Sequence, residues 1–220
     1  MNAVTDDARI IDGARLAAPF AAADFLDGVA FGVVAVGLGV GAVQATVLSA
    51  TAFSGSAQFA SLTVLGDHGS LLAILVAVIA LNARYLVFGA SVASSLSRNP
   101  FRRIAEAQML TDASWALSLR GGRPNRSLLV GAGLVSFLTW TTGTAAGAAF
   151  GGVLDDTSAV GLDAALPAFF VCLMIERLRT RGDVAAAGAG ALLAVALAPF
   201  VPAGVPLLVV LATALVLRSA

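Results

Sequence analysis

Residues 28–66 read GVAFGVVAVGLGVGAVQATVLSATAFSGSAQFASLTVLG, and no charged side chain interrupts them. A helix needs about 20 apolar residues to cross a bilayer, so this run is long enough for two crossings. We predict two helices with a turn near Gly41–Gln44, and we place Asp24 and Asp27 beside the start of the first helix, where they could cap it or carry protons. A soluble domain would have to cover such a run with polar surface, which this chain lacks.

The rest of the chain has the same character, since 59% of its 220 residues are hydrophobic and only 12% are charged. Gly69–Ser97 is interrupted only by Arg84, and Ser127–Leu154 and Val184–Leu217 carry no charge at all. A shorter apolar segment lies near Asp163–Ile175. The sequence therefore predicts an all-α polytopic protein of the inner (plasma) membrane, with one transmembrane domain over residues 1–220 and about seven membrane-spanning helices.

The basic residues exclude several kinds of chemistry. All thirteen are arginine, so the chain has neither a Walker A lysine nor a lysine for a Schiff base. An intramembrane serine protease built on Ser54 or Ser56 would need a nearby general base, and the single histidine, His68, lies in a predicted loop. We therefore predict no enzyme, no cofactor, no metal and no nucleic-acid partner.

The arginines also predict an orientation, because short cytoplasmic loops of membrane proteins are rich in basic residues. They gather in segment 98–126, in segment 177–181 and at Arg218, whereas the loops at Gly66–Gly69 and Asp155–Asp163 contain none. With seven spans, the arginine-rich segments lie inside and the N-terminus lies outside.

A faint internal repeat relates residues 13–97 to residues 127–202, with the arginine-rich segment 98–126 between them. Gly28 and Gly32 in the first half match the regularly spaced Gly143, Gly147 and Gly151 in the second. Three helices in each half would make the second half inverted relative to the first. We predict a 3+3 inverted repeat with discontinuous helices and one extra C-terminal helix; a chance likeness is the alternative.

The stretch Phe53–Ala60, FSGSAQFA, is the most polar part of the opening run. In many transporters, paired helices are interrupted by glycine or proline at the midplane of the bilayer. Gly55 would be such a position, and Pro167 would match it in the second half. A half-helix starting here would offer free N–H groups to an anion, with side-chain hydrogen bonds from Ser54, Ser56 and Gln58 beside the small Ala57. A close helix contact is the alternative reading of these small residues.

Arg84 lies near the centre of the third predicted span, with Asn82 two residues before it. A charge at that depth is costly, so it must be paired or must face a cavity. Its candidate partners are Asp24, Asp27, Asp112 or a substrate carboxylate, which arginine can hold in a bidentate manner. A purely structural ion pair is the alternative. Trp140, among several threonines, could likewise line a polar cavity.

Several motifs together resemble the AzlC family of branched-chain amino acid permeases. FSGSAQFA is similar to that family's F-A-G-S-A-Q-F signature, and four more segments follow in the family's order: LNARYLVFG, LTDASWAL, WTTGTAAGAAFG and GLDAALPAFFVCLM. The resemblance extends from about Gly13 to Met174. Two positions depart from the family pattern, since Ala113 replaces a frequent acidic residue and Tyr85 a frequent histidine.

The resemblance implies the large subunit of a two-component exporter of leucine, valine and isoleucine, with a small hydrophobic AzlD-type subunit as partner. We expect transport to be secondary active and coupled to protons; the alternative is a passive channel or a structural subunit. Taking the resemblance with the residue chemistry, we predict coupling or ion-pair residues at Asp27 and Asp112. The predicted substrate-binding residues are Gly55, Ser56, Ala57, Gln58, Asn82, Arg84, Trp140 and Pro167.

Overall fold

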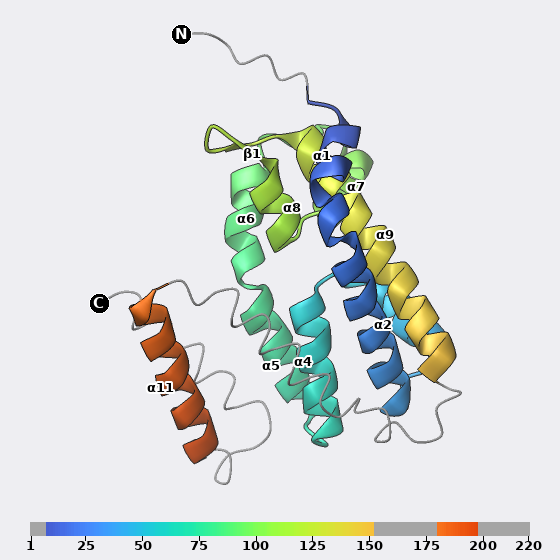
Figure 1. The fold of residues 1–220 in the computed structure, drawn as a ribbon, viewed down its shortest axis with the longest axis vertical. Coiled ribbons are helices and arrows are strands. Elements are labelled where there is room, and N and C mark those ends of the chain that lie inside the picture. The colour runs from blue at the N-terminus through green and yellow to red at the C-terminus, as the bar shows by residue number, and fades with distance from the viewer. Residues whose placement is uncertain (1–7, 152–179, 198–220) are drawn as a thin grey trace. The chain divides into compact units, whose positions relative to one another are not determined.

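The computed structural model describes residues 8–151 and 180–197, and these are almost entirely helical (Figure 1). The helices are α1 (Ile10–Ala17), the 3-10 helix η1 (Ala18–Phe20), α2 (Ala21–Gly37), α3 (Ala42–Thr51), α4 (Gly55–Gly66), α5 (Leu71–Asn82), α6 (Arg84–Val92), α7 (Pro100–Gln108), α8 (Asp112–Ser118), α9 (Arg126–Gly151) and α11 (Arg181–Leu197). The only strands in this part of the chain, β1 (Leu119–Arg120) and β2 (Arg123–Pro124), form a short antiparallel hairpin.

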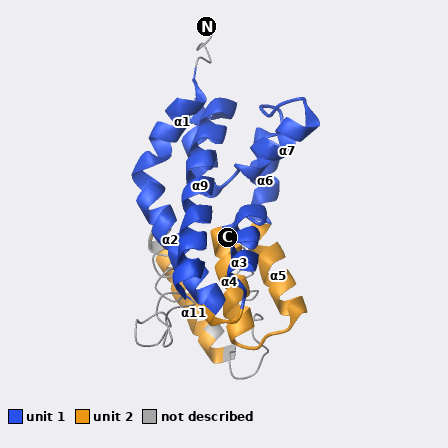
Figure 2. Ribbon diagram, turned by 90° about the vertical axis from the view of Figure 1, so that its right-hand side faces the viewer, with its two compact units in different colours: residues 1–36, 40–54, 83–152 blue, residues 37–39, 55–82, 153–220 orange. Residues whose placement is uncertain are grey.

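The chain divides into two compact units (Figure 2). The first comprises residues 1–36, 40–54 and 83–152, and the second comprises residues 37–39, 55–82 and 153–220. In the second unit α4 packs against α5, and the tight turn between them uses His68 with a positive φ of 55°. The first unit holds α1, α2, α3 and α6 to α9.

Two helices among the described residues are long and apolar enough to cross a membrane, namely Ile10–Gly37 and Arg126–Gly151. The α5 and α6 helices, which are separated at Ala83, pass the same test only when they are counted together. The helical membrane class is therefore confirmed. The count of seven stays a prediction, because the segments near Asp163–Ile175 and beyond residue 197 lie outside the described residues.

The first span begins earlier than the sequence suggested. α1, η1 and α2 follow one another without a gap, because Pro19 sits at the start of η1, where its missing N–H costs nothing. Asp24 and Asp27 therefore lie along a continuous helix rather than at its beginning. The predicted turn near Gly41–Gln44 is also misplaced, since α2 already ends at Gly37 and the chain turns with Gly39 at φ 83°.

The two short helices after this turn do not read as a single span. α3 has 10 residues and α4 has 12, each too short to cross a bilayer. A Cβ built at Gly66, the last residue of α4, would lie 3.4 Å from Cδ2 of Leu38, in the turn that follows α2. The chain thus returns, at the end of α4, to the turn from which it left α2.

The α1–α2 rod packs along α9 through glycines. A Cβ added at Gly28 would overlap the carbonyl oxygen of Trp140, and one added at Gly147 would overlap that of Val29. Small residues let two backbones approach this closely, which in a membrane is a main source of helix association. A buried hydrogen bond of 2.8 Å between the hydroxyls of Ser49 and Thr144 holds α3 to the same helix.

This packing explains the glycines that suggested an internal repeat, because the two sets face each other. Residue numbers increase in the same direction along both helices, from the contact of Gly13 with Leu128 to the contact of Gly151 with Val33. The α1–α2 rod and α9 therefore run parallel (Figure 1). The predicted 3+3 inverted repeat stays a prediction, because residues 152–179 of its second half lie outside the described residues.

Candidate functional site

The candidate site of the first unit is centred on the interruption after α3. α3 ends at Thr51, and residues 52–54 are not helical before α4 begins at Gly55, so the predicted break is present. The last carbonyls of a helix lack intrahelical partners. Here the Gln108 side-chain amide, at the end of α7, donates to the carbonyl oxygens of Ala50 at 3.0 Å and Thr51 at 3.1 Å.

Arg84 forms an ion pair with Asp112 near this interruption. Its Nη2 lies 3.0 Å from Asp112 Oδ2, and the two side chains are 36% and 26% exposed. Asp112 is the first helical residue of α8, and the Thr111 hydroxyl caps that helix by accepting from the Ser114 N–H. Of the candidate partners considered for Arg84, the structure places Asp112 beside it. Partial exposure leaves the pair within reach of a small ligand.

Tyr85 connects this ion pair to the interruption. Its hydroxyl donates to Asp112 Oδ2 at 3.5 Å and its side chain also interacts with Ser54, the last residue before α4. The Arg84 guanidinium lies 5.4 Å from the centre of the Tyr85 ring. Tyr85 was singled out in the sequence only as a departure from the family pattern, whereas Ser54 was considered both as a hydrogen-bonding residue of the break and as a protease nucleophile.

Aromatic side chains adjoin Tyr85 and the interruption. Phe53, in the interruption, meets Phe137 of α9 edge to face with ring centres 5.4 Å apart. Phe88 lies 6.0 Å from the Tyr85 ring and stacks on Trp115 at 4.6 Å, and the indole N–H of Trp115 donates to Ser91 at 2.8 Å. The site therefore combines one positive and one negative side chain, two hydroxyls and apolar ring surface.

The other predicted residues lie elsewhere. Trp140 is 6% exposed and stacks on Phe31 at 6.4 Å, so it packs α9 against α2. Asp27 is half-buried on α2, and the Asp24 carboxylate interacts with the Ser136 hydroxyl of α9 rather than capping a helix end.

The remaining predicted residues belong to the second unit or are not described. Ala57 and Gln58 are buried and Gly55 and Ser56 half-buried in the first turn of α4, and Asn82 is the half-buried last residue of α5. Their grouping with Arg84 stays a prediction, and Pro167 lies outside the described residues. Within residues 8–151 and 180–197, no cluster of three metal-ligating side chains occurs.

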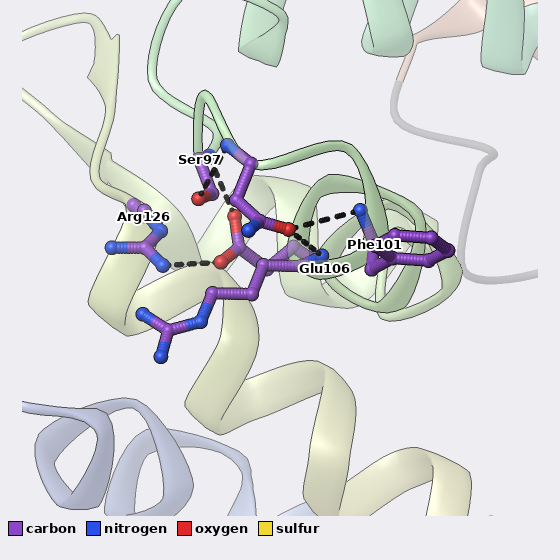
Figure 3. A network of polar contacts seen from close by, with 6 residues as sticks. Ser97, Phe101, Glu106 and Arg126 are labelled. Carbon is purple, nitrogen blue, oxygen red and sulfur yellow. Dashed lines mark hydrogen bonds and ion pairs between the residues drawn. The ribbon is translucent and has the colours of Figure 1, made fainter.

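A second polar cluster lies in the arginine-rich segment and was not predicted (Figure 3). Glu106 of α7 is only 7% exposed; one carboxylate oxygen pairs with Arg126 at the start of α9, and the other accepts from the Ser97 N–H at 2.8 Å. Bonding to Arg126 is the main cause that holds the pKa of Glu106 below its usual value of 4.5. A glutamate between Arg103 and Arg120 was the available signal.

Lowering the pH is expected to weaken this cluster in a defined window. Because folding lowers the pKa of Glu106, its contribution to stability is complete above pH 4.5 and is lost as the pH falls through the lower pKa. Glu106→Gln should remove this pH dependence and cost about 1.5 kcal/mol, at the lower end for charged hydrogen bonds because Arg126 is 46% exposed. Thermal unfolding in detergent between pH 3 and pH 7 measures both effects.

The exposed carboxylate of Asp67 provides the control, since Asp67→Asn removes a negative charge in a loop. An Asp67→Asn protein should keep the pH dependence of the parent. If Glu106→Gln also kept it, the ion pair with Arg126 would not be its source.

Comparisons with known proteins agree with this description. The profile of the family described as AzlC protein matches residues 19–154. An uncharacterized membrane protein of Archaeoglobus fulgidus is 34% identical over 163 residues, which cover 73% of this chain and 72% of the relative. An uncharacterized membrane protein of Helicobacter pylori is 24% identical over 159 residues, which cover 70% and 69%. No solved structure matches the chain. With its match across more than half of the chain, the protein belongs to the AzlC family of membrane proteins.

Proposed function

We propose that this chain is the large subunit of a secondary active exporter of branched-chain amino acids such as leucine, valine and isoleucine. The observation that carries the proposal is the Arg84–Asp112 pair, 3.0 Å apart and partly exposed beside a helix interruption. An amino acid at neutral pH carries one carboxylate and one ammonium group. A single pair of opposite side-chain charges is complementary to both.

Substrate binding would exchange one ion pair for two. The substrate carboxylate would take the Arg84 guanidinium, which can hold both oxygens at once, and the ammonium group would take Asp112. Tyr85, which already donates to Asp112, would keep that carboxylate oriented during the exchange. The charges of Arg84 and Asp112 would thus stay compensated with and without substrate, which a membrane environment requires.

The aromatic surroundings favour an aliphatic substrate side chain. Phe53 and Phe88 flank the polar groups with ring surface and contribute no hydrogen-bonding group. Burying a leucine side chain against such a surface stabilises the complex by about 1.5–3 kcal/mol. A polar substrate side chain would leave its hydrogen bonds unmade and would bind less well.

Proton exchange would drive the export. Moving one charge through 100 mV supplies about 2.3 kcal/mol, which is enough to concentrate a substrate without ATP. With Asp112 assigned to the ammonium group, Asp27 would carry the coupling proton. The transporter would work in the inner (plasma) membrane together with a small hydrophobic AzlD-type subunit. A passive channel or a structural subunit without its own transport cycle remains the second candidate.

Efflux of preloaded labelled leucine and valine tests the proposal. The chain would be expressed alone, with its small partner, and not at all, and efflux would be followed with and without a collapsed proton gradient. We expect faster efflux with both subunits and a loss of net export when the gradient is collapsed. Efflux equal to that of empty cells, from correctly inserted protein, would contradict the proposal. Efflux that ignores the gradient would favour the channel.

A further inference from the structure

The α7 helix lies at the level where α9 enters the membrane. Arg126 is the first residue of the span-length helix α9, and its guanidinium pairs with Glu106 of α7. Asn125 caps the start of α9 by accepting from the Leu128 N–H at 3.1 Å. Because the end of a membrane span lies at the lipid headgroups, the ion pair fixes α7 at that depth.

The apolar side of α7 points away from the protein. Phe101 is 82% exposed and Ile104 is 70% exposed, whereas Glu106 is buried. At 100° per residue, Phe101 and Ile104 lie about 140° and about 160° around the helix from Glu106. Figure 3 shows the Phe101 ring directed away from Arg126. A helix that packed on a soluble protein would have the opposite arrangement, with its apolar side inward.

Exposed arginines flank this apolar side, between it and Glu106 on either side of the helix. Arg102 and Arg103 lie on α7, and Arg98 lies two residues before its first residue. None of the three forms a close ion pair with another described residue; Glu106 pairs with Arg126, and Arg102 acts on Glu106 only at longer range. The Asn99 side chain caps α7 by accepting from the N–H groups of Phe101 and Arg102, so the helix itself is well defined.

We propose that α7 is an interfacial anchor for anionic phospholipids, in which Phe101 and Ile104 enter the acyl region while Arg98, Arg102 and Arg103 bind headgroup phosphates. A short helix with an apolar side and flanking basic residues has the character of a membrane-surface segment. The positive charge selects anionic lipid over a neutral bilayer, because basic residues close to such a surface are attracted to it. The proposal does not depend on the transport substrate.

A fluorescent probe at position 101 tests this anchor in the full-length protein. Cys172 is the only cysteine, so Cys172→Ala with Phe101→Cys leaves a single site for an environment-sensitive dye. The labelled protein would be reconstituted in phosphatidylcholine alone and with increasing phosphatidylglycerol. We expect the emission to shift to the blue and to brighten as the anionic lipid increases. Each arginine removed from α7 should lower the ratio of inserted to withdrawn probe about fivefold.

Two double variants with the same loss of charge provide the comparison. Arg102→Gln with Arg103→Gln should abolish the response to phosphatidylglycerol, whereas Arg120→Gln with Arg123→Gln, in the β hairpin, should keep it. Equal emission in both bilayers, from labelled and folded protein, would overturn the proposal. A blue shift that appears only when a small membrane subunit is added would overturn it too, because the apolar side would then bind protein.

Discussion

Replacing Arg84 by alanine is expected to reduce leucine and valine efflux to the level of cells that lack the protein. The variant would lose the group proposed to hold the substrate carboxylate, and it would leave Asp112 without its guanidinium partner at 3.0 Å. Truncating one member of a buried charge pair costs about 2–5 kcal/mol, and the partial exposure of Arg84 and Asp112 places this pair at the lower end. About 2 kcal/mol corresponds to a loss of apparent affinity of roughly 25- to 30-fold, at about 1.4 kcal/mol for each factor of ten. Initial efflux rates from cells loaded with a range of labelled leucine concentrations measure it.

Two controls distinguish a binding role from a structural one. Arg123→Ala removes an exposed arginine of the β hairpin and should leave efflux unchanged. The charge-swapped protein, Arg84→Asp with Asp112→Arg, should insert and fold like the parent because the ion pair is rebuilt. It should still fail to export, because the opposite charges would face the two ends of the substrate. Normal export by the swapped protein would show that the pair is purely structural.

Those parts of the site that depend on local sequence signals could be predicted. An arginine in an apolar segment demands a partner whatever the fold, so the pairing of Arg84 could be narrowed to three aspartates and a ligand. Likewise, the small and polar residues around Gly55 disfavour a continuous apolar helix, and the structure has a helix interruption directly before that residue. Both predictions follow from the cost of burying charge or backbone in lipid.

Features that depend on contacts between distant segments could not be predicted in this way. Gln108 caps the end of α3 by donating to the Thr51 carbonyl, 57 residues earlier in the chain. No sequence pattern near Gln108 or Thr51 predicts this contact. The burial of Glu106 depends on Arg126, which lies in a different helix. The glycines of α2 and α9 suggested an internal repeat, which stays a prediction. Their four-residue spacing did not show that the two sets would pack against each other.

Gly147→Val is expected to leave little folded protein, because the α1–α2 rod and α9 could no longer pack as they do. A Cβ at position 147 would overlap the carbonyl oxygen of Val29, and a backbone atom cannot move aside as a side chain can. Overpacking costs about 1–3 kcal/mol where neighbours can adjust, and more is expected here. Size-exclusion chromatography after detergent extraction, followed by a thermal melt, measures the loss.

Gly89→Val is the matched control for this change. Gly89 also lies within a helix, but nothing in the described structure lies within 4 Å of a Cβ at that position. It introduces the same β-branched residue and therefore the same change in helix propensity, a gain of about a few tenths of a kcal/mol over glycine. Equal melting temperatures for the two variants would mean that α2 and α9 do not approach closely at Gly147. A large difference would localise the loss to that contact, since propensity and side-chain volume are identical in the two proteins.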